Sequence, residues 1–554
     1  MKRCPECGRN YNDDSMSFCL DDGAALLFGP ASMDEPETAI LTTHNISSEQ
    51  ATGSLGQVSS PVATPFTGTT QSAWKKNSKI AGVFGIILVA ALGIGSYVYY
   101  GGGSARQINS IAVMPFTNDS GNAENEYLSE GMTETLIASL SQIAGLNVKA
   151  RSSVFRYKGK ETDAKTVGRE LGVQTLLSGR LIRGEDGLML SLELVDATTE
   201  NSIWSQQYVF KVTDLVSLQR QVARDVSNKL KTKLSSTDVS KIGKTYTSNT
   251  EAYQQYLQGR FYWNKQSYDA MEKSIDFYNK AIVADPNFGD AFASLALSYL
   301  WTGNRDAARN AAVRALSIDD ELAKAHLAIG AIKVSEFDWA HGEKELRRAV
   351  ELDSKDAVGH DFLGIYLAWI GKPVDAEREM HLALDSDPLS LVVNRHFAAC
   401  LTWARDYDRA VIQLQGLLQR EPDFVYGYID LGNNYQFKGQ TNDAISSFNR
   451  ALELDPGNSS ALAGLAITYA KSDRIPDARK IVSKLDSEFS TNGPYESLVK
   501  IHASLGEKDI AFMFLEKAIR ARDEVVDLKV DPSFDSLRDD VRFAVNLKLL
   551  GLPE

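Results

Sequence analysis

The chain has 554 residues, with 59 Lys and Arg against 72 Asp and Glu, so its formal net charge is −13. Nonspecific nucleic-acid binding needs a basic surface, and this acidic balance argues against nucleic acid as a partner of the main domains. Only four cysteines are present, and three of them lie within the first nineteen residues, which excludes a scaffold built on disulfides. The length is sufficient for several domains.

The N-terminal segment, residues 1–30, carries a group of candidate metal ligands. Four of them follow the spacing C-x2-C-x11-C-x2-D: Cys4, Cys7, Cys19 and Asp22. This pattern resembles a short zinc ribbon, in which thiolates and other donors hold Zn²⁺ in a tetrahedral set. Because a segment this short has little core, a structural zinc ion would supply most of its folding energy. Cys or His is usual as the fourth ligand, and Asp21 or His44 are weaker alternatives to Asp22.

A linker and an apolar stretch come next. Residues 31–79 are rich in Ser, Thr, Gly and Ala, and because they offer little apolar surface to bury, we expect a disordered linker. Ile80–Tyr100 is an uncharged run of 21 residues, which is the length of a helix that crosses a bilayer. A buried core helix is the alternative. Lys75, Lys76 and Lys79 precede the run, so the positive-inside rule predicts a cytoplasmic N-terminus.

Together these features predict a single-pass protein of a bacterial inner membrane, with residues 101–554 in the periplasm. Ala81 and Gly85, and again Ala91 and Gly95, have the spacing of small residues that permits close helix pairing, so a homodimer through the span is possible. The clustered cysteines would then lie in the reducing cytosol, where thiols favour metal binding over disulfides.

Residues 107–235 are predicted to form a small α+β domain. A buried strand over Ser110–Phe116 and an amphipathic helix over Glu126–Ile143 begin it, and three alternating strands and a last helix complete the order βαβαβββα. Four segments carry a resemblance to a known family: IAVMPF (111–116), YLSEGMTETLIASLSQIAGLNVKAR (127–151), FRYKGK (155–160) and VGRELGVQTLLSGRL (167–181). They resemble the family related to the amino-terminal domain of TolB proteins, which implies an accessory or interaction domain.

A strict period of 34 residues governs the second half of the chain. An acidic residue, often followed by proline, recurs at this period and would end a helix each time. Two sets of small residues keep the same period: Ala296, Gly330, Gly364, Ala398, Gly432 and Ala466, and Ala308, Gly342, Ala376, Ala410, Ala444 and Ala478. Antiparallel helices can cross closely only where both present small side chains, so the period predicts stacked helix pairs.

The period and its residues resemble the tetratricopeptide repeat. About eight units would span residues 252–526, the first with an insertion within its first helix at Tyr253–Trp263, and residues 527–554 would form a helical cap. The predicted fold class is therefore a multidomain one. It is an α-solenoid (αα superhelix) preceded by a small α+β domain, one transmembrane helix at residues 80–100 and a small zinc ribbon.

The first helix of each unit is expected to line the concave side of the solenoid. Nine residues are predicted there as a partner-binding groove: Leu297, Leu300, Lys324, Leu327, Asp361, Ile365, Arg395, Tyr426 and Asn433. A mostly apolar lining with isolated charges suits an extended peptide or a partner helix.

We find no catalytic motif in the sequence: the histidines are scattered, and no P-loop or kinase signature is present. Cys400 lies beside the small Ala398 and is expected in the core. The sequence therefore predicts a membrane-anchored protein-binding scaffold that is not an enzyme. Three alternatives stay open. The solenoid could be only a spacer, the protein could couple partner binding outside to the cytosolic zinc ribbon as a signalling or regulatory protein, or residues 107–235 could be a cryptic enzyme.

Overall fold

The computed structural model describes residues 108–143, 145–183, 187–230, 247–265, 267–489, 495–522 and 525–552, together with three short strands near the N-terminus. The chain divides into two compact units, Met1–Gly101 and Gly102–Glu554.

The N-terminal unit is described only at three short strands, which form an antiparallel sheet in the order β2-β1-β3: β1 (Lys2–Arg3), β2 (Asn10–Tyr11) and β3 (Leu27–Phe28). The four predicted metal ligands Cys4, Cys7, Cys19 and Asp22 lie outside the described residues, as do the predicted linker and the predicted span Ile80–Tyr100. A zinc ribbon is therefore not shown and stays a prediction.

The predicted localisation in a bacterial inner membrane is corrected by the structure. Among the helices that the structure describes, none is both long enough and apolar enough to cross a bilayer. The longest helix of the repeat region, α8, has 17 residues and carries charges along it, whereas a span needs about 20 predominantly apolar residues. We therefore do not retain the single-pass topology, the periplasmic placement of residues 101–554 or the homodimer through the span.

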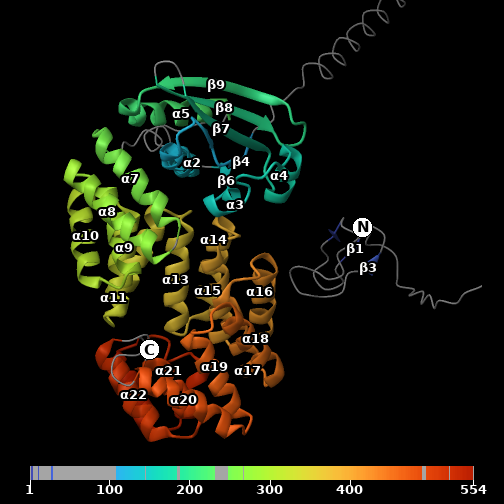
Figure 1. The fold of residues 1–554 in the computed structure, drawn as a ribbon, viewed down its shortest axis with the longest axis vertical. Coiled ribbons are helices and arrows are strands. Elements are labelled where there is room, and N and C mark those ends of the chain that lie inside the picture. Colours follow the sequence, from blue (N-terminus) through green and yellow to red (C-terminus); the bar gives the residue numbers. More distant parts are fainter. Residues whose placement is uncertain are drawn as a thin grey trace, which may run out of the picture. The chain divides into compact units, whose positions relative to one another are not determined.

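A small domain with one mixed sheet begins the second unit (Figure 1). Its strands are β4 (Ser110–Val113), β5 (Thr117–Asp119), β6 (Asn147–Val148), β7 (Thr175–Arg183), β8 (Leu188–Asp196) and β9 (Ser202–Phe210). The sheet order is β6-β4-β7-β8-β9, with β5 also paired to β7. β4 runs parallel to β6 and β7, whereas β7, β8 and β9 are antiparallel.

The helices of this domain are α2 (Glu126–Ser141), α3 (Arg151–Phe155), α4 (Ala164–Leu171) and α5 (Leu215–Lys229), with the short 3-10 helices η1 (Ala123–Asn125) and η2 (Val212–Asp214). The observed order agrees with the predicted α+β arrangement, apart from the additional β5 and α3. The sheet alternates buried and exposed side chains along the second half of β7, as a strand covered on one face requires.

Eight helix pairs follow in the part of the chain that the structure describes. They are α7 (Thr250–Trp263) with α8 (Tyr268–Ala284), α9 (Gly289–Trp301) with α10 (Arg305–Ile318), α11 (Ala323–Ser335) with α12 (Trp339–Leu352), α13 (Ala357–Trp369) with α14 (Pro373–Ser386), α15 (Leu391–Trp403) with α16 (Tyr407–Arg420), α17 (Val425–Phe437) with α18 (Thr441–Leu454), α19 (Ser459–Lys471) with α20 (Ile475–Phe489), and α21 (Tyr495–Ser504) with α22 (Lys508–Ala521). We number them repeats 1 to 8.

The second helix of repeats 1 to 6 ends at the repeated acidic residue. These C-cap residues all leave the helical region, with φ between −130° and −147°: Asp285, Asp319, Asp353, Asp387, Glu421 and Asp455. The small residues of the period stand where helices approach one another. A Cβ atom added to Gly330 would lie 2.8 Å from the side chain of Leu346, and one added to Gly364 would lie 2.8 Å from Met380. The small residues of the sequence period therefore mark the positions where helices cross closely.

Repeat 1 differs from the prediction of an insertion within its first helix. α7 is unbroken, and its Gly259 faces Tyr278 of α8, where an added Cβ would lie 2.6 Å from the ring. α8 has 17 residues, whereas α10 has 14. The extra residues therefore lengthen the second helix and leave the first intact.

Candidate binding groove

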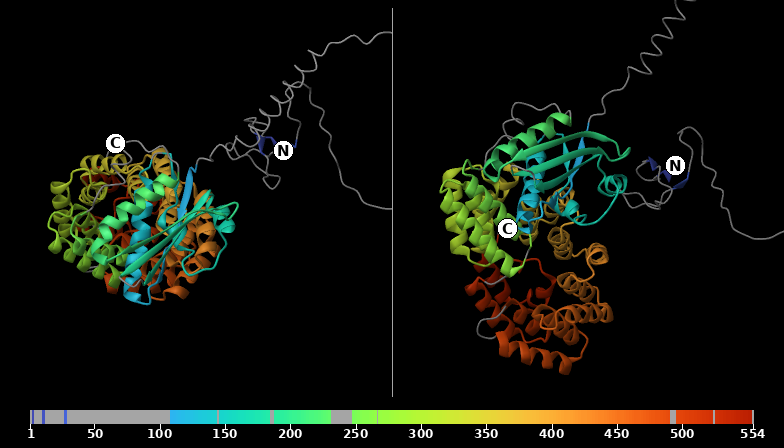
Figure 2. Two further views of the ribbon diagram at one scale, coloured as in Figure 1. Left: turned by 90° about the horizontal axis from the view of Figure 1, so that it is seen from above. Right: turned by 45° about the horizontal axis from the view of Figure 1, so that its top comes forward.

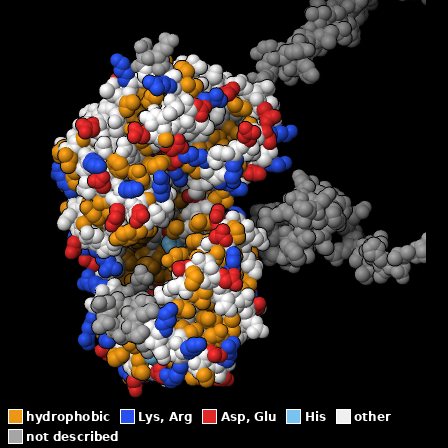
Figure 3. All heavy atoms as spheres, in the orientation of Figure 1, with side chains coloured by type: hydrophobic (Ala, Val, Ile, Leu, Met, Phe, Trp, Pro, Cys, Tyr) orange, Lys and Arg blue, Asp and Glu red, His pale blue; other side chains and the backbone are white. Residues whose placement is uncertain are grey.

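The first helices of the repeats form one continuous surface. Adjacent first helices, such as α9 with α11 and α13 with α15, contact each other directly, which places them on the inner side of a curved array. Figure 2 shows the helix pairs curving around this side, which we call the concave face. Figure 3 shows a hollow near the middle of the molecule with apolar side chains exposed in it.

Polar pairs join neighbouring first helices along the concave face. His396 Nδ1 lies 2.8 Å from a carboxylate oxygen of Asp361, and Arg395 donates to Asp430 at 2.6 Å. Lys471 Nζ donates to Gln436 at 3.2 Å. In each pair the two residues are 35 positions apart, one more than the period. We call this set the concave ladder. It fixes the spacing of repeats 4 to 7 and leaves polar groups at the surface.

The predicted groove residues fall into three groups by exposure. Leu327, Asp361 and Ile365 are buried, with exposed fractions of 1%, 2% and 7%. Tyr426 is 48% exposed. The rest are half-buried: Leu297, Leu300, Lys324, Arg395 and Asn433. The structure therefore brings Arg395 and Tyr426 together, with the guanidinium 5.0 Å from the ring centroid. The carboxylate of Asp361 instead pairs with the imidazole of His396.

An aromatic stripe follows the same face. Trp301, Trp369, Trp403 and Phe437 are the last residues of α9, α13, α15 and α17. The rings of Trp369 and Trp403 lie 6.2 Å apart between centroids, and Lys471 Nζ lies 5.4 Å from the Phe437 centroid. Trp301 is 43% exposed. Sequence reasoning missed this stripe, although its spacing of 34 residues, with one repeat skipped, was a readable signal.

The C-terminal segment, residues 525–552, reaches far beyond the last repeat. It contains η3 (Pro532–Leu537) and α23 (Val541–Leu550). α23 packs on α22, as a cap would. The segment also contacts repeats 3 to 5. Trp339 Nε1 donates to the carbonyl oxygen of Leu550 at 2.6 Å, and Lys529 Nζ donates to that of Ile370 at 3.1 Å. The predicted cap is therefore also a bridge across the solenoid.

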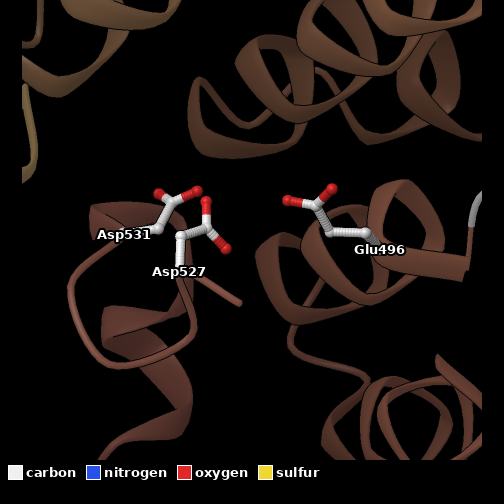
Figure 4. Close-up of side chains that lie close together, drawn as sticks. All are labelled: Glu496, Asp527 and Asp531. Atoms are coloured by element: carbon white, nitrogen blue, oxygen red, sulfur yellow. The ribbon is translucent and has the colours of Figure 1, made fainter. Parts of the chain in front are cut away.

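Three carboxylates surround one lysine where this segment meets α21. Figure 4 shows Glu496, Asp527 and Asp531 facing one another, and their oxygens lie within 4.8 Å. The ammonium group of Lys500 lies 2.7 Å from Asp531 and also pairs with Glu496. Burial raises the pKa of Asp527 well above its usual range. For Asp531 the effect of burial is outweighed by Lys500, and its pKa is lowered. The positive charge of Lys500 therefore explains why these carboxylates lie together, and the ion pairs connect the C-terminal segment to α21.

A histidine clip joins the two helices of repeat 4. His360 is buried, with Nδ1 2.8 Å from a carboxylate oxygen of Glu379 and Nε2 3.1 Å from the carbonyl oxygen of Ser354. Both partners are acceptors, so the doubly protonated ring fits best. Burial lowers the pKa of His360, but the bonds to Glu379 and Ser354 outweigh it and the net shift is upward. His326, 34 residues earlier, makes the same two contacts in repeat 3.

A buried polar cluster fastens the α+β domain to repeat 1. Glu134 of α2 accepts from Arg260 of α7 at 2.7 Å and also from Arg151 and Asn264. Its side chain is only 3% exposed. At the C-terminal end of α2, Lys355 Nζ donates to three backbone carbonyls, the closest that of Ser141 at 2.7 Å. The domain is therefore held at two separate places on the solenoid.

Comparison with known families supports this description. A family model described as "Tetratricopeptide repeat" matches residues 438–500. The solenoid is of the tetratricopeptide type. A second model, described as "HilA/YgeH-like transcriptional regulator, second domain", matches residues 106–226. This match covers the predicted α+β domain, while the likeness to TolB domains is not shown.

Individual proteins match parts of the chain. It is 29% identical over 278 residues to "Putative adenylate cyclase 3" of Rhizobium meliloti (strain 1021), covering 48% of this chain and 42% of that protein. It is 23% identical over 201 residues to "Tetratricopeptide repeat protein 6" of Homo sapiens, covering 36% and 38%. The solved structure of YrrB, "a TPR protein with an unusual peptide-binding site", is 18% identical with a TM-score of 0.27, covering 33% of this chain and 95% of that one. The chain spans less than half the length of these curated relatives.

Proposed function

We propose that the solenoid is a protein-interaction scaffold that holds a partner protein or peptide on its concave face. The tetratricopeptide type of the repeats supports this function, because stacked helix pairs present an extended inner surface. The single observation that carries the proposal is the row of accessible groups along that surface. Tyr426 and Trp301 offer exposed aromatic area, and the half-buried Arg395, which pairs with Asp430, lies beside the Tyr426 ring; Tyr, Trp and Arg are typical of protein-binding sites.

An affinity capture with matched variants tests this function. The tagged full chain is incubated with extract of the source cells, crosslinked and analysed by mass spectrometry. A partner recovered by the unmodified chain should be lost when Arg395 and Tyr426 are both replaced by Ala. It should be kept by Val283→Ala, since Val283 is 81% exposed on the second helix of repeat 1. Recovery that is equal in all three chains would contradict binding on the concave face.

A regulatory role is the second candidate. It is favoured by the match of residues 106–226 to a domain of HilA/YgeH-like transcriptional regulators and by the relative named as an adenylate cyclase. The double fastening of the α+β domain through Glu134 and Lys355 gives a physical route, because a change in solenoid curvature would strain these contacts. Hydrogen exchange in α2 with and without the captured partner tests it, and unchanged exchange there would argue for a plain scaffold.

We do not propose catalysis. Cys400 is the cysteine that the described residues contain, and it is 5% exposed. Burial raises the pKa of its thiol well above the usual value, so the nucleophilic thiolate is disfavoured. The thiol serves as a small core group on α15.

We further propose a structural Zn²⁺ ion on Cys4, Cys7, Cys19 and Asp22. Cys4 and Cys7 lie in the sequence between the paired strands β1 and β2, and thiolate with carboxylate is a donor set that Zn²⁺ accepts. Elemental analysis of the purified full chain should find zinc close to one equivalent per chain, and Cys7→Ser should lose it. Zinc that is retained in Cys7→Ser would refute this assignment.

A further inference from the structure

The C-terminal segment does more than cover the last apolar face of the solenoid. A terminal cap needs to contact only its neighbouring repeat. Here Arg405, in the turn of repeat 5, pairs with Asp535 at 2.8 Å, although the two residues lie 130 positions apart. Trp339 and Lys529 make the comparable contacts in repeats 3 and 4. The segment therefore crosses from repeat 8 to the middle of the solenoid.

Part of this segment packs on an apolar cluster that includes predicted groove residues. Val526 packs on the apolar cluster that contains Leu327 and Ile365. Trp369 and Trp403 of the aromatic stripe pack on that same cluster. Leu327 and Ile365, which the sequence predicts to be available to a partner, therefore belong to an apolar cluster that the C-terminal segment also packs against.

The segment has a distinct chemistry. Phe534 and Leu537 are fully buried apolar anchors, three positions apart. Acidic residues flank them, with Asp531 paired to Lys500 and Asp535 to Arg405. Burial lowers the pKa of Lys471 in α19, and the negative charges of Asp531 and Asp535 act against this shift. Lys500 and Arg405 therefore pair with aspartates of the segment, while two buried apolar side chains hold it in the apolar cluster of repeat 8.

We propose that residues 525–538 are an internal ligand of the solenoid, and that the partner held by the scaffold carries an acidic segment with two similarly spaced apolar anchors that displaces them. This inference rests on the proposed scaffold function. A tethered segment has an effective concentration in the mM range, so an external segment must bind more tightly or contact more of the concave face. The scaffold is then closed at rest and opens to a matching partner.

A peptide exchange experiment tests the internal ligand directly. The probe is a fluorescein-labelled synthetic peptide with the sequence of residues 525–552, and its anisotropy is measured against the full chain and its variants. Phe534→Ala in the chain removes one anchor, and the probe should then bind at least ~10-fold more tightly than to the unmodified chain, because each ~1.4 kcal/mol lost by the tethered segment is a tenfold change. Asp539→Asn is the control, since Asp539 is exposed on the same segment.

Each result has a defined meaning. Equal probe binding to Phe534→Ala and the unmodified chain, with helical circular dichroism intact, would overturn the proposal and leave a plain cap. If Phe534→Ala loses its helical circular dichroism, the double variant Asp531→Asn with Asp535→Asn is used in its place. These two substitutions leave no cavity, and the probe should still bind several-fold more tightly to the double variant than to the unmodified chain. Dimers of the unmodified chain in light scattering would indicate that a second copy of this chain binds the solenoid. That result would refute the proposal that the partner is a different protein. If the probe binds more tightly to the variant as expected, but the affinity capture recovers no partner, the result would count only against the proposed scaffold function.

Discussion

A methyl group added at Gly464 tests whether the glycines at the helix crossings are close-packing positions. Gly464 of α19 lies against Phe448 of α18, and an added Cβ would stand 2.3 Å from the ring. The ring cannot move away easily, because it is fully buried and an added Cβ at Gly432 on α17 would also lie 2.8 Å from it. The ring is therefore held between two glycines of successive repeats.

The magnitude follows from two opposing contributions. Ala instead of Gly inside a helix gains about 1 kcal/mol in backbone propensity. Overpacking a well-filled core costs about 1–3 kcal/mol, and the short distance to a confined ring points to the upper end, so Gly464→Ala should lower the free energy of unfolding by about 2 kcal/mol. Gly416→Ala is the matched control. It lies within α16, where an added Cβ would meet only Arg420 at 3.9 Å, and should stabilise by up to about 1 kcal/mol.

Urea unfolding followed by circular dichroism measures both changes as shifts of the midpoint at an unchanged slope. The two substitutions are chemically identical and both lie inside helices, so only the local packing differs. A Gly464→Ala chain that is as stable as the Gly416→Ala chain would refute the reasoning that the glycines on both sides of Phe448 mark steric contacts.

Two further predictions concern buried ionisable groups. Because the pKa of folded His360 is raised, its contribution to stability is complete below its unfolded pKa of about 6.5 and is lost as the pH rises through the folded value. The unmodified chain should therefore lose unfolding free energy between pH 6 and pH 8.5, and His360→Asn should lose less over the same range. Equal losses in the two chains would contradict a stabilising role of the His360–Glu379 contact. Glu134→Gln leaves Arg260 and Arg151 without their carboxylate and should cost about 3 kcal/mol, the low end for a broken buried pair because Arg151 is 30% exposed. Faster hydrogen exchange in α2 and α7 would show this cost, with exposed Glu124→Gln as the control, and unchanged exchange would disprove the fastening.

Much of the repeat fold could be predicted from the sequence because close crossings leave a record at fixed positions. The acidic helix ends from Asp285 to Asp455 and the glycines opposite Leu346 and Met380 are local steric requirements. The α+β domain was predictable for a similar reason, since each strand of β7, β8 and β9 shows its own apolar pattern.

The groove was less predictable because its contacts join distant parts of the chain. Each pair of the concave ladder joins polar side chains of two successive repeats, as Asp361 and His396 do. The sequence does not show which polar side chain of one repeat will pair with which of the next. The contact of Arg405 with Asp535 depends on the curvature accumulated over several repeats, which no local pattern encodes. Reading the histidines as scattered overlooked that His326 and His360 are spaced by one full period.

The bond from Trp339 to the carbonyl of Leu550 has a consequence for how the protein melts. An open array of repeats unzips from its ends, since a terminal unit has a single neighbour. Tying the last helix to repeat 3 removes that weak end, so repeats 3 to 8 should denature as one cooperative block. Cutting this tie would convert a single sharp transition into gradual erosion from the C-terminus.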